Sequence, residues 1–294
     1  MDTIWTNFAG AGVKEAYIDA NGVRTRVLEA GSGAPLIMLH GTGGHAETYT
    51  RNIAPLSKHC HVLAVDMIGH GYTDRPQVTY TMDVFADHIV AVMDAYGIDK
   101  ATICGESLGG GVACWAALKY PDRVSALILN TGILARPDNA GSKQLDDMEA
   151  RTRRLLTEFS RDTIRRRLEW LVLDPATMSD EIVDVRFNIY SQPGMVEHMV
   201  ELMSTVFQMN RGAVGDIDYY GHSLTGISCP ALVIWTDHNP GKSLAAVQAS
   251  IDSIPQREFH LLSGAAHWAQ WEKAEEVNGL MADFLQRQTV MVPA

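Results

Sequence analysis

Short apolar stretches alternate with longer segments of helical spacing along most of this chain. The stretches occupy residues 34–40, 61–67, 101–107, 125–131, 231–237 and 257–264, and most of them end in Gly, Asp, Ser or Thr. Each is long enough for a buried strand and too short for an ordinary helix. Buried strands that alternate with helices form a mostly parallel sheet with helices on both faces. The sequence therefore predicts an α/β fold.

Two further patterns refine this prediction. An Asn-Gly pair at residues 21–22 separates two short β-rich stretches and is typical of a hairpin turn. Residues 142–193 contain no glycine, although glycines are frequent before them. We expect this segment to belong to a helical lid over residues 136–213, inserted into a core formed by residues 1–135 and 214–294.

The predicted lid is rich in charge. Within residues 143–170, 14 of 28 side chains are charged, and seven of these are arginines. Arginine clusters bind nucleic acid, but acidic residues are interleaved here and aromatic residues are sparse. We therefore expect the arginines from Arg151 to Arg167 to form a solvated helix face.

Net charge and cysteine usage limit the classes of partner. The 294 residues carry 24 Lys and Arg against 35 Asp and Glu, and a net charge of −11 disfavours binding to nucleic acid or anionic membranes. The scattered cysteines are expected to be free buried thiols. No apolar stretch reaches the roughly 20 residues that span a bilayer, and the N-terminus lacks a secretory signal pattern. We expect a soluble cytoplasmic protein.

One pentapeptide carries the signature of a nucleophile. G-E-S-L-G at residues 105–109 follows a β-rich stretch and precedes a helical one. A strand-to-helix turn this tight needs nearly side-chain-free positions two before and two after the serine, and it exposes the Ser107 hydroxyl near a helix N-terminus. A glycine-rich turn of another α/β fold would give the same letters, so the pentapeptide alone leaves the function open.

A second glycine-rich motif lies where an acyl-transfer site needs it. H-G-T-G-G at residues 40–44 follows a predicted strand. The backbone N–H groups of Thr42 and Gly43, with that of Leu108, would face an acyl oxygen as it gains negative charge. A phosphate-binding loop is the competing interpretation, but the chain lacks the G-K-[ST] sequence at the required spacing.

Two histidines complete the pattern. His70 lies in D-M-I-G-H-G-Y-T-D at residues 66–74, and we expect it to hold this turn through hydrogen bonds. No second ligand lies at metal-binding spacing from it, so no metal is expected. His267 follows the last predicted strand, where a general base belongs in the chain order serine, acid, histidine. Together the motifs resemble those of the α/β-hydrolase fold, a mostly parallel sheet flanked by helices with an inserted helical lid.

Within that fold, the chain resembles the meta-cleavage-product hydrolases, which cleave carbon–carbon bonds during aromatic degradation. The likeness is strongest in H-W-A-Q-W-E at 267–272, in R-N at 51–52 and in D-V-R-F at 184–187. It implies that Ser107 is the nucleophile and His267 the base. It also implies that Arg186 binds the substrate carboxylate and that Trp268 shapes the pocket, without a cofactor. Dimers are common in the family, so the resemblance suggests a homodimer.

The chain departs from the family pattern beside the nucleophile. Where the family has an asparagine that helps to bind the substrate, this chain has Glu106, and an anionic glutamate would repel a substrate carboxylate. Thr48 replaces a second polar asparagine after the oxyanion loop. We retain Glu106 as a candidate substrate-binding residue.

The catalytic acid is the third departure. The family places its aspartate four residues after Trp235, and Asn239 occupies that position here. Either Asp237 reaches His267 through a shifted turn, or the site uses Asn239, or the chain carries an inactivating change. We favour Asp237, because losing the carboxylate costs about 10⁴ in kcat in a serine protease.

These observations favour a serine hydrolase that forms an acyl-enzyme on a small, carboxylate-bearing, aromatic-derived substrate. The resemblance implies cleavage of a carbon–carbon bond in a ring-fission product. The alternatives are a carboxylesterase for monoesters of aromatic diacids, a lactonase, and a catalytically silent ligand-binding protein of the same fold, to which Asn239 would be suited.

Overall fold

The predicted sheet is present. The computed structural model describes residues 3–136, 139–212, 214, 216–240 and 242–290. Its strands form one sheet in the order β1-β2-β4-β3-β5-β6-β7-β8, in which β2 runs antiparallel to β1 and β4 and the other neighbours are parallel. The strands are β1 (Lys14–Ala20), β2 (Val23–Ala30), β3 (Pro35–Leu39), β4 (His61–Val65), β5 (Ala101–Glu106), β6 (Val124–Asn130), β7 (Ala231–Thr236) and β8 (Arg257–Leu262).

The N-terminal hairpin is also confirmed. Strands β1 and β2 pair up to Ala20 and Val23, which leaves Asn21 and Gly22 as the two turn residues. Both have positive φ, 54° and 83°. A two-residue hairpin turn of this kind requires positive φ at both positions, which asparagine and glycine adopt most readily.

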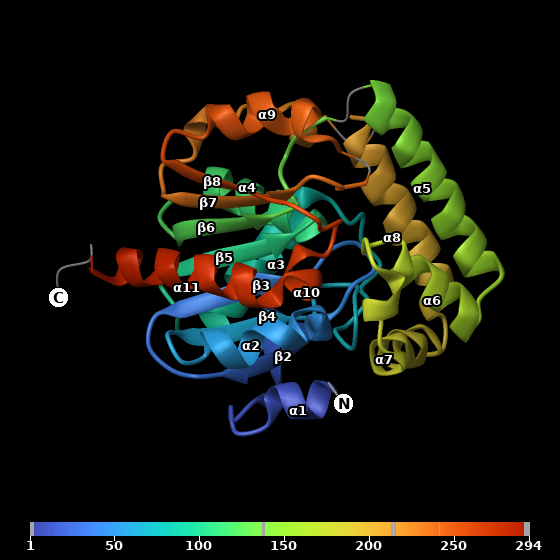
Figure 1. The fold of residues 1–294 in the computed structure, drawn as a ribbon, viewed down its shortest axis with the longest axis horizontal. Helices are drawn as coiled ribbons and strands as arrows, with labels where there is room; N and C mark the ends of the chain where they lie inside the picture. Colours follow the sequence, from blue (N-terminus) through green and yellow to red (C-terminus); the bar gives the residue numbers. More distant parts are fainter. Residues whose placement is uncertain (1–2, 137–138, 213, 215, 241, 291–294) are drawn as a thin grey trace.

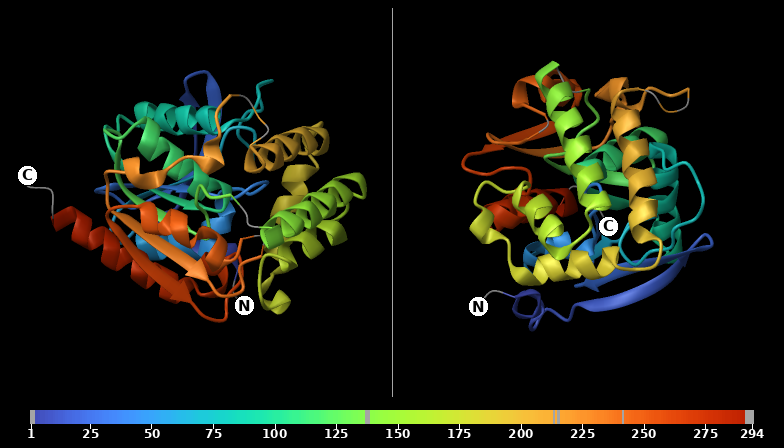
Figure 2. Two further views of the ribbon diagram at one scale, coloured as in Figure 1. Left: turned by 90° about the horizontal axis from the view of Figure 1, so that it is seen from above. Right: turned by 90° about the vertical axis from the view of Figure 1, so that its right-hand side faces the viewer.

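Helices cover both faces of the sheet (Figures 1 and 2). In β3, Leu36 and Met38 belong to the apolar cluster that includes α2 and α11, whereas Ile37 and Leu39 belong to the cluster that includes α3 and α4. This alternation follows from the two-residue period of a strand. The core helices are α1 (Ile4–Phe8), α2 (Thr50–Leu56), α3 (Met82–Ala95), α4 (Leu108–Lys119), α9 (Leu244–Ser253), α10 (Ala269–Glu272) and α11 (Ala274–Val290), with 3₁₀ turns η1 (Ala46–Tyr49), η3 (Tyr219–Gly221) and η4 (Leu224–Gly226).

Four helices follow β6 and precede β7. They are α5 (Asn139–Thr157), α6 (Arg161–Glu169), α7 (Asp180–Tyr190) and α8 (Met195–Asn210), with η2 (Pro175–Thr177) between α6 and α7. Figure 1 shows them together at one end of the sheet, where α5 packs against α8 and α6 against α7. They occupy the segment predicted as a lid, and residue 213 at its predicted boundary lies outside the described residues.

Several sequence expectations concern the described residues as a whole. The four cysteines, Cys60, Cys104, Cys114 and Cys229, are free and buried, as predicted. No described helix combines the length and apolarity needed to cross a bilayer. Among the described side chains, no group of three or more His, Cys, Asp or Glu residues is arranged to hold a metal ion.

Candidate active site

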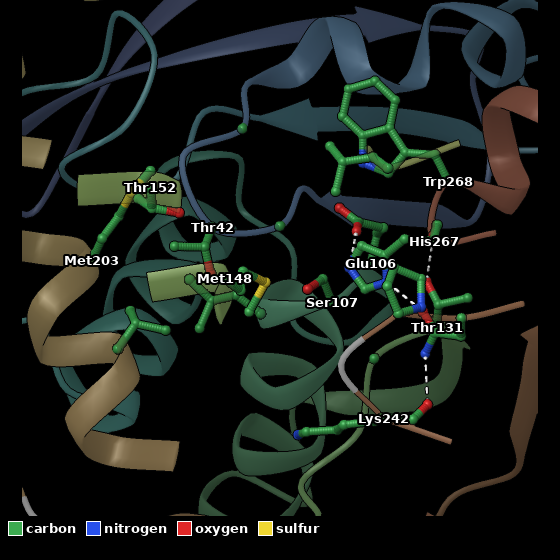
Figure 3. Close-up of a pocket in the computed structure, with 18 of the residues that line it drawn as sticks. Thr42, Glu106, Ser107, Thr131, Met148, Thr152, Met203, Lys242, His267 and Trp268 are labelled. Carbon is green, nitrogen blue, oxygen red and sulfur yellow. Dashed lines mark hydrogen bonds and ion pairs between the residues drawn. The ribbon is translucent and has the colours of Figure 1, made fainter. Parts of the chain in front are cut away.

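A pocket lies between the carboxyl ends of the parallel strands and the lid helices. Its hollow measures about 940 Å³, part of it open to solvent. The strand ends contribute Ser107, Asn239 and His267, and the lid contributes Arg167 and Arg186. The predicted nucleophile, base and carboxylate-binding residue therefore line one pocket, although they are distant in sequence. Figure 3 shows Ser107 and His267 in this pocket.

The serine lies on a strained strand-to-helix turn. Ser107 joins β5 to α4 with φ 54° and ψ −114°, a conformation that costs a non-glycine residue free energy. A methyl group on Gly105 would collide with the backbone of Gly109, and one on Gly109 would collide with the backbone of Leu39. The two glycines of the pentapeptide are thus required by close backbone approach, as the sequence predicted.

The glycine-rich loop after β3 packs between this turn and the lid. A methyl group on Gly41 would contact the Glu106 and Ser107 side chains, and one on Gly43 would contact Met203 and Tyr190 of the lid. The Tyr190 hydroxyl donates a hydrogen bond to the Gly43 carbonyl at 3.1 Å. Of the three predicted oxyanion positions, Thr42 and Leu108 line the pocket, and Gly43 lies beneath the lid.

The loop that carries His267 is fixed to both core and lid. The Thr131 hydroxyl donates to the His267 carbonyl at 2.7 Å, and the Trp268 N–H donates to the Leu171 carbonyl at 3.0 Å. The Glu272 carboxylate accepts from the N–H groups of Ala266 at 2.7 Å and Leu173 at 2.6 Å. These contacts give a structural role to the H-W-A-Q-W-E segment: it joins the imidazole to the lid.

The preference for Asp237 as the partner of His267 is wrong. Asp237 turns to the β8 side, where it accepts the Gly264 N–H at 3.0 Å and lies 2.7 Å from His238 Nδ1. The atom that contacts His267 Nδ1 is Asn239 Oδ1, at 2.6 Å. Asn239 therefore occupies the position next to the imidazole from which the ring can be oriented.

The second hydrogen bond of Asn239 fixes the tautomer of His267. Its Nδ2 donates to the Lys242 carbonyl at 3.2 Å, so its oxygen faces the imidazole and accepts the Nδ1 proton. This leaves Nε2 unprotonated, as a general base requires. Burial, with Arg167 and Lys242 nearby, lowers the His267 pKa to about 3. The imidazole is neutral at pH 7.

Glu106 lies on the catalytic side of this imidazole. Its Oε1 is 3.2 Å from His267 Nε2, and its side chain is 2% exposed. Burial raises the Glu106 pKa to about 8, so the carboxyl group is protonated at pH 7. Among the described residues, the Ser107 hydroxyl forms no hydrogen bond with Nε2 in this arrangement. Nε2 therefore faces Glu106, and Ser107 lines the same pocket.

Arg186 is buried and lines the pocket, although arginines usually lie at the surface. It is 4% exposed on α7, and its guanidinium carbon lies 5.5 Å from the centre of the Trp268 ring. Two of its nitrogens, Nε and Nη2, are buried without a hydrogen-bond partner among the described residues. Because a buried unpaired guanidinium is costly, this arrangement favours an anionic ligand.

The expectation that all the lid arginines form a solvated face is wrong for Arg167. It lines the pocket, and its Nη1 is buried without a hydrogen-bond partner in the described chain. Arg167 follows Ile164 by three residues and precedes Leu168, both fully buried on α6. That spacing places Arg167 on the apolar face of the helix. The number of charged residues in this segment does not show this, whereas the spacing from Ile164 does.

Lys242 also lines the pocket, and sequence reasoning missed it altogether. It belongs to the β7–α9 loop, which carried no motif beyond the acid position. Its Nζ lies 4.6 Å from the centre of the Tyr220 ring, and burial lowers its pKa to about 7. The pocket therefore contains three basic side chains against one carboxyl group.

His70 and the R-N pair at 51–52 support the site from outside the pocket. His70 is fully buried, and its Nδ1 lies 3.2 Å from the Ile68 carbonyl, which confirms the predicted structural role. Arg51 donates to the Trp271 carbonyl at 2.7 Å, and Asn52 donates to the Gln270 carbonyl at 3.1 Å. Both anchor the segment that follows His267.

Comparisons with known proteins agree with this geometry. Residues 34–274 match the family model described as alpha/beta hydrolase fold. The chain is 32% identical to a 2-hydroxy-6-oxononadienedioate/2-hydroxy-6-oxononatrienedioate hydrolase of Paraburkholderia phymatum, over 97% of this chain and 99% of that one. It is 30% identical to a 2-hydroxymuconate semialdehyde hydrolase of a Pseudomonas species, over 91% and 92%. A meta-cleavage product hydrolase from Pseudomonas fluorescens IP01 superposes with a TM-score of 0.80 at 28% identity, over 92% and 97%.

Proposed function

The chain belongs to the α/β-hydrolase family and, within it, to the meta-cleavage product hydrolases, and we propose from this premise that it hydrolyses a carbon–carbon bond in a carboxylate-bearing ring-fission product. The observation that carries the proposal is the buried, unpaired guanidinium of Arg186 in the same pocket as Ser107. A carboxylate bound there would satisfy the guanidinium and place the rest of a small substrate beside the serine.

The proposed reaction begins with ketonisation of the dienol substrate, so that the leaving carbon can depart as a stabilised enolate. His267 then takes the Ser107 proton on Nε2, and the serine oxygen attacks the carbonyl carbon. The N–H groups of Thr42, Gly43 and Leu108 donate hydrogen bonds to the developing oxyanion. Each hydrogen bond stabilises the transition state by about 3 kcal/mol. The carbon–carbon bond breaks, the enolate takes up a proton, and water hydrolyses the acyl-enzyme.

Glu106 fits this reaction as a neutral acid. A protonated carboxyl group donates a hydrogen bond, as an asparagine amide would, and does not repel the substrate carboxylate held by Arg186. Glu106 Oε1 lies 3.2 Å from His267 Nε2, where the Ser107 hydroxyl must donate its proton. We infer that substrate binding directs the Glu106 proton to the substrate and lets Ser107 form a hydrogen bond with Nε2.

The decisive test uses a ring-fission dienoate, whose yellow colour disappears when the conjugated chain is cleaved. Purified protein should bleach it and release two products, of which one is the carboxylic acid formed from the acyl-enzyme. A carboxylesterase would instead hydrolyse monoalkyl phthalates and leave the dienoate coloured. The esterase alternative rests on Glu106, which in its anionic form would oppose a dienoate at that position. Hydrolysis of a monoalkyl phthalate without bleaching of the dienoate would overturn the carbon–carbon proposal.

Replacing Arg186 with glutamine should raise KM for carboxylate substrates by about 30-fold or more, the equivalent of about 2 kcal/mol for a desolvated charge pair. Steady-state kinetics on the dienoate and on a neutral ester such as p-nitrophenyl acetate provide the comparison. Arg166→Gln, on an exposed position of α6, is the matched control. An equal loss on both substrates would contradict a carboxylate-binding role.

The pH dependence of KM tests the neutral state of Glu106. Only the protonated form should accept a carboxylate beside it, and its pKa of about 8 makes KM rise about tenfold between pH 7 and pH 9. In Glu106→Gln, whose amide cannot ionise, this rise should disappear. The substrate should carry a single carboxylate, so that Lys242 does not contribute. A rise that persists in the glutamine variant would assign the titration to another group.

A further inference from the structure

The charges of the pocket exceed what a monocarboxylate needs. Arg167, Arg186 and Lys242 line it, and Glu106 is its single acidic side chain among the described residues. None of the three basic groups forms an ion pair with a carboxylate in the described chain. A protein with a net charge of −11 therefore concentrates unpaired positive charge in one cavity. Such an arrangement favours an anionic ligand with more than one charged group.

The basic groups come from different sides of the nucleophile. Arg186 extends from α7 to the Trp268 ring, 5.5 Å away, whereas Lys242 extends from the β7–α9 loop to the Tyr220 ring, 4.6 Å away. Figure 3 shows Trp268 on one side of Ser107 and Lys242 on the opposite side. A substrate attacked by the serine in its middle would have one end near each cation.

The surroundings of Lys242 would suit an anion, because the residues that line the pocket beside its side chain include no carboxylate other than Glu106 in the described chain. No carboxylate or carbonyl in the described chain accepts a hydrogen bond from its Nζ, and its face-on contact with Tyr220 offsets only part of the cost of burying a charge. Burial has lowered its pKa to about 7, so a carboxylate in contact with it would favour the charged form again.

We propose that Lys242 forms a second anion-binding position opposite Arg186, so that the pocket selects substrates with a carboxylate at each end. This inference rests on the proposed function for the position of the first carboxylate at Arg186. Arg167 lies on the lid side, where its charge acts on Arg186 and Glu106, and we assign it to the first carboxylate.

The kinetic test uses two ring-fission dienoates that differ only at the distal end, one with a terminal carboxylate and one with a methyl group. The unaltered protein should show a kcat/KM at least tenfold higher for the dicarboxylate. Lys242→Met keeps the length of the side chain and removes its charge, and it should bring the ratio of the two kcat/KM values close to one. Lys100→Met, an exposed lysine far from the pocket in sequence, should keep the full preference.

Arg167→Met distinguishes the contribution of Arg167 from that of Lys242. It should lower kcat/KM for both substrates to a similar extent, because both carry the first carboxylate. If the preference for the dicarboxylate vanished in Arg167→Met and persisted in Lys242→Met, the assignment to Lys242 would be overturned. A wild-type protein without preference between the two substrates would overturn it as well.

A binding measurement keeps this proposal separate from the reaction. Calorimetric titration with heptanedioate and heptanoate needs no turnover, and the diacid should bind at least tenfold more tightly to the unaltered protein but not to Lys242→Met. If neither dienoate were cleaved while this difference held, the proposed reaction would fail and the second anion position would stand. Equal affinities for the two acids in the unaltered protein would refute that position.

Discussion

Asn239→Asp should raise kcat by about 10²- to 10³-fold, because it adds a carboxylate beside the catalytic imidazole. Asn239 Oδ1 already lies 2.6 Å from His267 Nδ1, so an aspartate of nearly the same shape would contact the same atom. The carboxylate would stabilise the imidazolium that forms when His267 takes the Ser107 proton. An amide only orients the ring.

The pKa of His267 explains why the gain should be large. Burial, Arg167 and Lys242 lower it to about 3, so the imidazole is a weak base at neutral pH. An adjacent carboxylate raises the pKa of a histidine toward the pH at which the enzyme works, where general-base catalysis is most efficient. The pH profile of kcat should therefore shift along the pH axis, and the maximum value of kcat should rise.

The gain should be smaller than the roughly 10⁴-fold effect of the carboxylate in a serine protease. In this chain the Asn239 amide also donates to the Lys242 carbonyl at 3.2 Å, and an aspartate would place an oxygen against that carbonyl instead. Part of the electrostatic advantage is lost to this repulsion, and the loop must shift to relieve it.

Asp237→Asn is the matched control for this experiment. Asp237 accepts the Gly264 N–H and contacts His238, both outside the pocket, so its replacement should change kcat by less than about threefold. Steady-state kcat and its pH profile would be compared for the two variants and the unaltered protein. If Asp237→Asn abolished turnover while Asn239→Asp left it unchanged, the orienting role would belong to Asp237.

The two acid candidates illustrate what a sequence does not determine. Both follow β7 within three residues, and either could face the imidazole if the loop turned appropriately. The structure decides through the backbone: the Asp237 N–H donates to the Leu262 carbonyl, which keeps this residue at the edge of β8. Asn239 is then the first side chain free to turn toward His267. Such a choice depends on strand register across two distant segments, which no local pattern encodes.

The strand-to-helix turn at Ser107 and the β1–β2 hairpin could be predicted because their requirements are local. Gly105, Gly109 and the Asn-Gly pair at 21–22 are needed by backbone conformation or by backbone contact, so residue type alone reveals them. Arg167 is the opposite case. Its charge suggested solvent, and only the packing of α6 against the other lid helices places its guanidinium in the pocket.

Ser107→Ala should lower kcat by about 10⁴-fold or more, because the variant retains the base and the oxyanion loop but has no nucleophile. Binding should survive, since the proposed carboxylate contacts involve Arg186 and the hydroxyl forms no hydrogen bond with His267 among the described residues. The dienoate should therefore stay yellow in the presence of the variant while its Kd, measured by spectral titration, remains within about threefold of the wild-type value.

The strained backbone at residue 107 makes a control necessary. Ser107 has φ 54°, and alanine tolerates this conformation no better than serine, so the fold of the variant should be checked by its Tm. Ser228→Ala, at an exposed position outside the pocket, should retain full turnover. A fluorophosphonate probe should label the unaltered protein at Ser107 and leave the alanine variant unlabelled. Turnover that survives in Ser107→Ala would mean that the acyl-enzyme does not form, and hydrolysis would then require direct attack by a water activated by His267.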